Sequence, residues 1–278
     1  MSQSNAAQGG PIKFWHQSMT ELQLLGPYRE YLESHARKVL GDSVSITVHG
    51  VKPGSYHGRA PTPALGNAFT YHRILDHVID NAYTAEKSGF DAFIVGSFSE
   101  PFLRELRSLV RIPVVSILES SLLISCSLGK KIVPLANGRE LEALVNSAAE
   151  KHGLRERIQP AATLSPPWHE PELAAAIHDP AKLIAAFRET AQKLVDGGAE
   201  VIIPAEGVLC AVLSANNVTE VGGAPVIDVF GATWLYAQML VRLRRLFGTT
   251  VSNVGAYAQA DRALVELVLG ASAGKPAA

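Results

Sequence analysis

Two stretches of the sequence share a pattern that ends on a polar residue. Residues 89–97 and 198–206 each begin with glycine, carry an acidic residue two positions later, and continue as an apolar run. The ninth position is Ser97 in the first stretch and Glu206 in the second, and each stretch is followed by another apolar run that opens on proline. This shared order predicts an internal duplication in which Ser97 and Glu206 occupy equivalent places.

Glu206 carries the side chain best suited to move a proton. Its apolar neighbours Pro204, Val208 and Leu209 predict a desolvated carboxyl, and desolvation raises a carboxyl pKa toward the range useful for general acid/base catalysis. A serine such as Ser97 is a poor acid and a poor base near neutral pH unless another group activates it. We therefore expect proton transfer on one face of a substrate, as in isomerisation, decarboxylation or elimination, with Glu206 and Ser97 as the catalytic residues.

Ser97 also opens a run of groups that can bind an anion. Ser97, Phe98 and Ser99 follow a predicted strand, where hydroxyls and free backbone N–H groups can bind a carboxylate or a developing enolate. Gly207 offers a further N–H group beside Glu206. Two other polar turns are expected to complete this substrate-binding cradle, with the residues His16, Gln17, Ser18, Glu119 and Ser120. Such donors suit a small carboxylate, a cyclic amide or an imide.

Each of these residues also has an ordinary structural role. Ser97 and Glu119 can cap helices, and Glu206 can be a solvated residue in a first helical turn, where the helix dipole favours it. Ser18 lies three residues before a glutamate, which is the spacing of a capping box. His16 can be a satisfied histidine at the end of a strand.

Two other functions use the same residues. Glu206, or His16, could deprotonate water or Ser97 for attack on a carbonyl, which would make the protein a hydrolase of a small amide, imide or cyclic amide. The sequence has no Gly-x-Ser-x-Gly elbow, so the common hydrolase architecture is not indicated. A small-ligand binding protein without turnover is the third alternative.

The elements that must position these residues have the pattern of an α/β protein with largely parallel sheets, because short branched apolar runs alternate with segments of helical period. The predicted strands cover residues 12–15, 44–51, 92–95, 114–118, 131–135, 158–163, 201–203 and 226–229. The predicted helices run from Pro27 to about Gly41 and over residues 67–88, 101–110, 139–152, 180–196 and 232–246. Ligands bind beyond the carboxyl ends of such strands, where Ser97 and Glu206 fall. The proline- and glycine-rich segment 52–66 is predicted to be a long loop, and such loops often cover sites.

Length and composition exclude several other classes of protein. The 278 residues predict roughly two domains, and 25 basic against 26 acidic side chains lack the positive field of a nucleic-acid binder. Two cysteines cannot make a disulfide framework, and the spacing of the histidines does not suit a metal site. No apolar run reaches the roughly 20 residues of a membrane span, and residues 1–10 are too polar for a signal peptide. We therefore expect a cytoplasmic globular protein with no nucleic-acid or membrane partner and no metal site.

The sequence resembles the aspartate/glutamate/hydantoin racemase superfamily from about residue 12 to residue 246. Residues 96–101, Gly-Ser-Phe-Ser-Glu-Pro, stand where hydantoin racemases typically carry Ala-Cys-Phe-Gly/Ser-Asp-Pro. Residues 205–209, Ala-Glu-Gly-Val-Leu, stand where they typically carry Gly-Cys-Ala-Gly-Met. An early Asn-Pro-Asn is replaced by His-Gln-Ser at residues 16–18, whereas a downstream Pro-Val-Ile-Asp is retained at residues 225–228.

This resemblance implies two similar flavodoxin-like α/β domains with parallel sheets, related by a pseudo-twofold axis, with the active site between them. The N-terminal domain would comprise residues 11–119 plus 230–247, and the C-terminal domain residues 120–229. Residues 248–278 would form a C-terminal helix and a tail that is frayed from about residue 270. A cofactor-independent enzyme, working as a homo-oligomer, is implied as well.

The resemblance also implies a change in chemistry. Racemases of this family use two cysteine thiolates on opposite faces of the substrate carbon, and here Ser97 and Glu206 stand at those positions. Cys210 lies four residues further on and is expected to pack as a small hydrophobe. We therefore expect one-base proton transfer rather than two-base racemisation.

Overall fold

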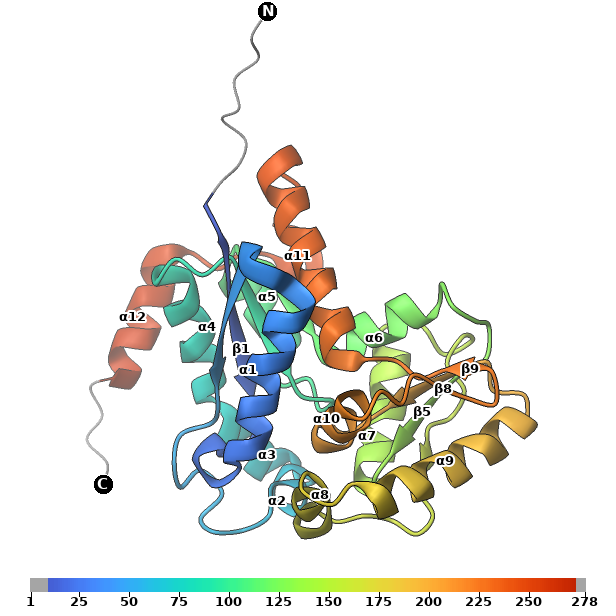
Figure 1. The fold of residues 1–278 in the computed structure, drawn as a ribbon. Helices are drawn as coiled ribbons and strands as arrows, with labels where there is room; N and C mark the ends of the chain where they lie inside the picture. The colour runs from blue at the N-terminus through green and yellow to red at the C-terminus, as the bar shows by residue number, and fades with distance from the viewer. Residues whose placement is uncertain (1–9, 274–278) are drawn as a thin grey trace, which may run out of the picture.

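The computed structural model describes residues 10–273, which form two parallel sheets surrounded by helices (Figure 1). In the first sheet the strand order is β2-β1-β3-β4, and each neighbouring pair is parallel. Its strands are β1 (Ile12–Ser18), β2 (Val44–His49), β3 (Ala92–Gly96) and β4 (Val114–Ser116). Every residue of β3 is buried, as expected for a central strand covered on both faces.

The second sheet repeats this order. Its strands are β5 (Ile132–Ala136), β6 (Ala162–Thr163) and β7 (Val201–Pro204). β5 pairs in parallel with β6 and with β7, and Val226 adds a single parallel bridge to Ile202 of β7. In both sheets the first strand lies between the second and the third, and a fourth segment adjoins the third. The predicted α/β class with parallel sheets is confirmed, and the shared order supports the internal duplication.

Helices and short ribbons connect these strands. The α-helices are α1 (Gly26–Leu40), α2 (Pro61–Leu65), α3 (Ala68–Leu75), α4 (His77–Lys87), α5 (Leu103–Leu109), α6 (Ile117–Ser125), α7 (Arg139–Lys151), α8 (Glu170–Ala176), α9 (Ala181–Asp196), α10 (Gly207–Ala215), α11 (Val229–Phe247) and α12 (Arg262–Ala273). The 3-10 turns are η1 (Leu22–Leu24), η2 (Gly41–Ser43) and η3 (Gly255–Tyr257), and β8 (Glu220–Val221) pairs antiparallel with β9 (Ala224–Pro225).

Helix α1 follows the pattern predicted for it. Pro27 lies in its first turn, where the missing N–H costs nothing. One face, which includes Tyr28 and Leu32, is buried. The helix stops at Gly41, whose φ of 60° lies in the left-handed region that glycine adopts without steric strain.

Several predicted boundaries were wrong, two of them where a capping side chain starts a helix. The strand predicted over 114–118 ends at Ser116, because the Ser116 hydroxyl accepts hydrogen bonds from the next helical N–H groups and starts α6. The strand predicted over 226–229 is one bridge, because the Asp228 side chain caps α11 there. The helix predicted over 67–88 is divided into α3 and α4 at Asp76.

Three further segments also differ from their predictions. The strand predicted over 158–163 pairs as β6 only at its end, apart from one bridge at Ile158. The loop predicted over 52–66 contains the short helix α2. The strand predicted over 12–15 continues to Ser18 as β1.

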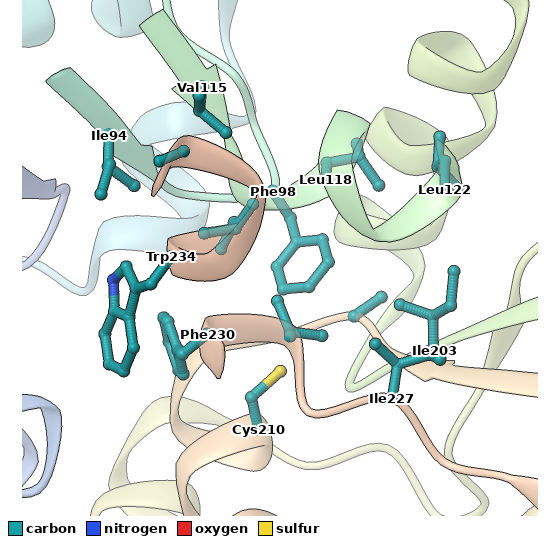
Figure 2. Packing of buried hydrophobic residues seen from close by; sticks show 14 of the residues in the cluster. Ile94, Phe98, Val115, Leu118, Leu122, Ile203, Cys210, Ile227, Phe230 and Trp234 are labelled. Carbon is teal, nitrogen blue, oxygen red and sulfur yellow. The ribbon is translucent and has the colours of Figure 1, made fainter. Parts of the chain in front are cut away.

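One continuous hydrophobic cluster joins the two sheets. It contains Phe98 from the first half, Ile203 and Cys210 from the second, and Phe230 and Trp234 from α11 (Figure 2). Helix α11 follows the second half in sequence but packs on α1, α6, β3 and β4. The chain therefore returns to the first sheet after completing the second, while the exact domain boundaries stay a prediction.

The two ends of the chain need separate mention. Residues 1–9 and 274–278, which include most of the predicted polar N-terminus and part of the predicted frayed tail, lie outside the described residues. In the part of the chain that is described, no helix is both long and apolar enough to cross a membrane.

Candidate active site

A cavity of about 350 Å³ lies between the two halves and takes its walls from both. The first half contributes the turn after β3, the start of α1 and part of the segment 52–66, and the second half contributes α7, α8 and the start of α10. The polar lining residues include Thr20, Glu21, Tyr28, Tyr56, Arg59, Thr62, Ser97, Ser99, Glu140, Glu170 and Glu206. Leucines and other apolar residues make up much of the remaining lining. A concave, largely apolar site with a few polar groups is typical of a small-molecule pocket.

The turn after β3 presents two serines to this cavity. The Ser97 hydroxyl accepts the Ser99 N–H at 3.2 Å, and the two serine hydroxyls are 2.9 Å apart. The Tyr71 hydroxyl donates to the Ser99 carbonyl oxygen at 2.8 Å. Helix α5 begins later, after Phe102, so Ser97 does not cap that helix. The hydroxyls of Ser97 and Ser99 therefore line the cavity as a fixed pair.

The backbone of this turn is held in an uncommon conformation. Glu100 and Phe102 have φ angles of 45° and 55°, in the left-handed region that side chains with a Cβ rarely adopt. Such strain persists only where surrounding contacts over-determine the conformation. At Glu100 those contacts are a buried polar cluster, described below.

Glu206 lines the cavity and also caps α10. Its Oε2 accepts the Leu209 N–H at 2.7 Å, so the helix-capping role and the cavity position coexist. Burial raises the pKa of the Glu206 carboxyl, and the charge of Glu170 raises it further, against the opposing effect of the N–H groups of residues 207–209. The carboxyl is thus shifted in the direction that general acid/base catalysis needs.

Tyr28 lies beside this carboxyl. The Tyr28 side chain lines the cavity, and its hydroxyl oxygen is 2.8 Å from the position that a Cβ on Gly207 would occupy. Burial, and then the charge of Glu206, raise the pKa of the Tyr28 phenol well above its ordinary value. The phenol is therefore neutral and available as a hydrogen-bond donor.

The charge of the lining is strongly negative. It contains the carboxylates Glu21, Glu140, Glu170 and Glu206 and one guanidinium, Arg59. Backbone N–H groups donate hydrogen bonds to two of these carboxylates. Glu21 accepts the Tyr56 N–H at 2.9 Å, and Glu170 accepts the Thr62 N–H at 3.0 Å. The field in the cavity opposes an anionic ligand and accommodates a neutral or cationic one.

The residues expected at the end of the first strand lie behind the cavity wall. Because β1 extends to Ser18, the side chains of His16 and Gln17 are fully buried. His16 Nδ1 accepts the Trp234 indole N–H at 3.4 Å, and burial lowers the pKa of His16 to about 3. The Gln17 amide joins Asn81 at 2.9 Å and the Gly50 carbonyl at 3.0 Å.

Ser18 likewise has a local structural contact. Its hydroxyl accepts the Thr20 N–H at 3.2 Å, and the capping box expected from its spacing to Glu21 does not form, because only the short turn η1 follows. None of His16, Gln17 and Ser18 is among the cavity-lining residues.

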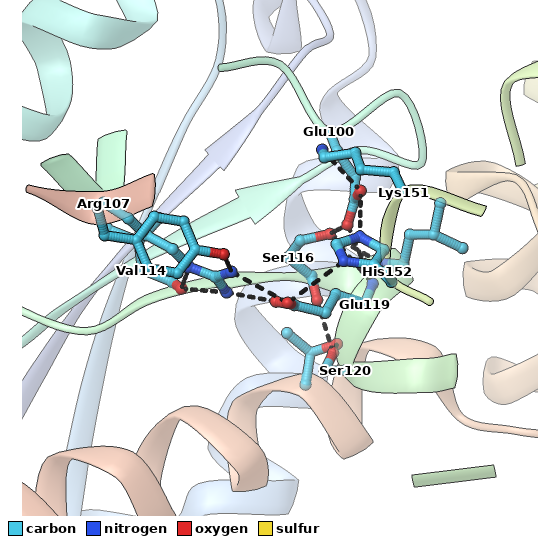
Figure 3. Close-up of polar contacts among 11 residues, drawn as sticks. Glu100, Arg107, Val114, Ser116, Glu119, Ser120, Lys151 and His152 are labelled. Carbon is cyan, nitrogen blue, oxygen red and sulfur yellow. Dashed lines mark hydrogen bonds and ion pairs between the residues drawn. The ribbon is translucent and has the colours of Figure 1, made fainter. Parts of the chain in front are cut away.

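Glu119 and Ser120 also belong to a buried polar cluster rather than to the cavity wall (Figure 3). Glu119 binds Arg107 through both oxygens, and it lies 3.5 Å from His152 Nδ1. Ser120 bonds to Thr233 at 2.7 Å. Because α6 starts at Ile117, that residue reaches the cavity instead.

Glu100 is the centre of the same cluster, and sequence reasoning did not single it out. Its side chain is 2% exposed, accepts the Glu119 N–H at 3.1 Å and lies 2.7 Å from His152 Nε2, with Ser116 as a further donor. Lys151 completes the ion pairs at 3.4 Å. The cluster thereby ties the turn after β3 to α6 and to the end of α7.

Of the ten predicted site residues, five line the cavity: Ser97, Phe98, Ser99, Glu206 and Gly207. The sequence interpretation missed Tyr28, Arg59 and Glu170. Tyr28 directly follows Pro27 in the predicted first helix, and a phenol near the start of that helix was an available signal. Arg59 lies in the segment 52–66, which was predicted to be a loop of the kind that often covers a site. In the described part of the chain no group of three or more His, Cys, Asp or Glu side chains forms a candidate metal site.

A cavity shared by two parallel α/β halves, with a glutamate of raised pKa on one side and a serine turn on the other, defines a two-domain α/β enzyme that acts on a small molecule. The chain belongs to the Asp/Glu/hydantoin racemase family, whose model matches residues 30–237. Membership assigns the protein to the racemases, which are isomerases, and gives no support to the hydrolase or lyase alternatives.

Solved structures show the same fold. An allantoin racemase from Klebsiella pneumoniae has a TM-score of 0.72 at 18% identity, with 90% of this chain and 94% of that chain covered. An allantoin racemase from Pseudomonas fluorescens has a TM-score of 0.72 at 20% identity, covering 90% and 97% of the two chains. A glutamate racemase from Bacillus anthracis has a TM-score of 0.57 at 13% identity and covers 94% of each chain. A comparison with curated protein sequences gives no match.

Proposed function

We propose that this racemase-family protein catalyses one-base proton transfer on a small, neutral cyclic amide of the hydantoin type. The observation that carries the proposal is Glu206, a carboxyl of raised pKa in the same cavity as the Ser97 turn of the other half. A carboxylate base with a raised pKa is a stronger acceptor for a carbon-bound proton than an ordinary surface glutamate.

The charge of the cavity distinguishes between the substrate classes that the sequence left open. Four carboxylates against one guanidinium line the walls, and two like charges about 4 Å apart repel by about 4 kcal/mol at the effective dielectric of a protein surface. A cyclic amide carries no formal charge and avoids this repulsion. The apolar lining favours a cyclic amide with an aliphatic substituent over a dicarboxylic amino acid.

In the proposed reaction Glu206 removes the proton from the carbon next to the amide carbonyl. The C–H bond breaks, the proton passes to the Glu206 carboxylate, and the electron pair moves onto the carbonyl oxygen. The Ser97 and Ser99 hydroxyls line the cavity and are hydrogen-bonded to each other, so one of the two keeps a free O–H group that can donate to a polar atom of the substrate. Return of the proton from Glu206 to the carbon regenerates the carboxylate and needs no co-reactant. The carbon is inverted when the planar intermediate turns over in the cavity and takes the proton on its other face, whereas return on the same face exchanges only the hydrogen.

Solvent exchange tests this function directly. A 5-alkyl hydantoin incubated with the protein in D₂O should lose its ring C–H proton signal, and aspartate and glutamate should exchange far more slowly. The Glu206→Gln variant should lower the exchange rate at least about 100-fold, the usual contribution of a general base. Glu189→Gln, on an exposed face of α9, is the matched control and should leave the rate unchanged. Unimpaired exchange in Glu206→Gln would refute the proposal.

A further inference from the structure

Tyr28 has a hydroxyl that the fold leaves without a partner at the cavity wall. The Tyr28 side chain is 2% exposed, and its ring packs against Phe230 with ring centroids 6.3 Å apart. Within residues 10–273 the Tyr28 hydroxyl makes no hydrogen bond. Two other tyrosines near the cavity differ, because Tyr56 donates to the Met19 carbonyl at 2.6 Å and Tyr71 to the Ser99 carbonyl at 2.8 Å. The Tyr28 hydroxyl is not among the buried polar atoms that lack a partner, so it keeps access to the cavity that its side chain lines, and a ligand bound there can be its partner. The Tyr31 hydroxyl, by contrast, is fully buried.

The position of this hydroxyl relates it to the proton carrier. A Cβ on Gly207, the residue that directly follows Glu206, would lie 2.8 Å from the Tyr28 oxygen. That distance is shorter than real Cβ contacts, so a glycine at this position lets the phenol approach the start of α10. The hydroxyl and the carboxyl therefore open onto the same part of the cavity from opposite halves of the molecule.

We propose that Tyr28 is a further catalytic residue, whose hydroxyl donates a hydrogen bond to the substrate oxygen that becomes negative when Glu206 removes the proton. This inference rests on the proposed function. The carbon-bound proton goes to Glu206, the electron pair goes to the carbonyl oxygen, and Tyr28 keeps its own proton throughout. A donor held in place before the reaction stabilises the developing charge without reorganisation, which is the basis of oxyanion stabilisation.

The burial of Tyr28 supports this role. Burial and the charge of Glu206 raise the pKa of the phenol well above its ordinary value, so the hydroxyl stays protonated over the whole working pH range. It therefore acts as a donor in the same range in which Glu206 is an ionised base. The two groups do not compete for one proton.

The test is the Tyr28→Phe variant, which removes one oxygen and keeps the ring that packs on Phe230. The kcat for solvent deuterium exchange into a 5-alkyl hydantoin should fall about 100- to 1000-fold, the usual effect of removing one oxyanion donor. KM should change little, and the pH at which activity rises should stay near the wild-type value because Glu206 is still present. A purely structural role would not produce this separation of kcat from KM.

Tyr31→Phe is the matched control. Tyr31 lies on the same helix, and its ring packs on the same Phe230 with centroids 6.4 Å apart, but it is not among the cavity-lining residues. Its activity should stay within about threefold of the wild type, a difference of about 0.6 kcal/mol. Equal losses in Tyr28→Phe and Tyr31→Phe, or a Tyr28→Phe rate near that of the wild type, would overturn the inference.

Gly207→Ala provides a second, independent variant. The added Cβ must displace the Tyr28 hydroxyl, so kcat should fall while Glu206 is retained; an unchanged kcat would contradict the role given to Tyr28. The failure of this inference is distinguishable from failure of the proposed function. If Glu206→Gln abolishes exchange and Tyr28→Phe does not, only the role of Tyr28 is wrong, whereas exchange that survives in Glu206→Gln removes both.

Discussion

At the scale of single residues, the Glu206 carboxyl experiences opposing electrostatic effects. Burial and Glu170 raise its pKa, and the N–H groups at the start of α10 lower it, with a net upward shift. A capping carboxylate on a helix is ordinarily held ionised by those N–H groups. The reversal at Glu206 arises because burial desolvates the carboxyl and because the carboxylate of Glu170 lies nearby.

This balance predicts the pH dependence of the reaction. The proposed reaction requires ionised Glu206, so kcat/KM should rise with pH through a pKa above the ordinary glutamate value of about 4.3. Because the charge of Glu170 raises the pKa of Glu206, Glu170→Gln should move this rise to lower pH. The pH profile of deuterium exchange, recorded for the wild type and for Glu170→Gln, measures the pKa of the rise and its shift. A rise that stays in place, or moves to higher pH, would contradict the electrostatic coupling.

At the scale of elements, the turn between β3 and α5 depends on contacts from other parts of the chain. The Glu100 carboxylate reaches His152 at the end of α7, Ser116 at the end of β4 and the Glu119 N–H in α6 (Figure 3). Burial alone would raise the pKa of Glu100, but His152, Ser116 and Lys151 outweigh it and the pKa is lowered. The position of Ser97 and Ser99 therefore depends on an ion cluster assembled from both halves.

Glu100→Gln should destabilise the protein by about 3–5 kcal/mol, the usual cost of breaking a buried ion pair by removing one partner. The direction in which this stabilisation changes with pH follows from the lowered pKa of Glu100. The contribution is complete above the unfolded-state value of about 4.3 and is lost as the pH falls through the folded-state pKa. Urea unfolding at several pH values measures the difference between wild type and variant.

Glu105→Gln is the control for this experiment, because Glu105 is exposed on α5 and its replacement should change the stability by less than about 0.5 kcal/mol. A Glu100→Gln difference that is small at neutral pH, or that grows as the pH falls, would show that the cluster does not stabilise the fold in this way.

At the scale of the whole molecule, the site exists only because the two halves are held together. The hydrophobic cluster that contains Phe98, Cys210 and Trp234 joins the sheets on one side (Figure 2). On another side α2 and α8 lie next to each other (Figure 1), and Glu170 of α8 accepts the Thr62 N–H of α2 at 3.0 Å. The segment 52–66 is thus fastened to the opposite half across the cavity.

Glu170→Ala should loosen this fastening without unfolding either sheet. A hydrogen bond to a charged group contributes about 1.5–3 kcal/mol, so the Thr62 amide should exchange with solvent at least about 10-fold faster in the variant. Amides of β3 should keep their protection and serve as the internal control. Hydrogen exchange measured by NMR or mass spectrometry distinguishes Thr62 from β3. Equal protection of the Thr62 amide in the wild type and the variant would show that Glu170 does not hold the segment 52–66 in place.

Whether the sequence predicted a site residue correctly depended on where the preceding strand ends. Ser97 directly follows β3 and Glu206 follows the end of β7 after one intervening residue. The rule that ligands bind beyond strand ends therefore predicted both at a site, and both line the cavity. His16 and Gln17 continue the strand β1 instead. Trp234 donates to His16 Nδ1, and Asn81 and a backbone carbonyl bond to the Gln17 amide, whereas His16 Nε2 is buried without a hydrogen-bond partner among the described residues. Those partners lie far away in sequence, and local pattern does not reveal them.

The sequence by itself determined the α/β class with parallel sheets, and it predicted an internal duplication with Ser97 and Glu206 at equivalent positions, because these depend on local apolar patterning and on residue order. Only the tertiary structure decided that Tyr28 opens onto the same cavity as Glu206 and that Glu119 is bound by Arg107. It alone also brought Glu170 close enough to influence the Glu206 pKa. Burial, charge coupling and the filling of a shared cavity are properties of residues brought together from distant parts of the chain, and they arise only when the two halves pack.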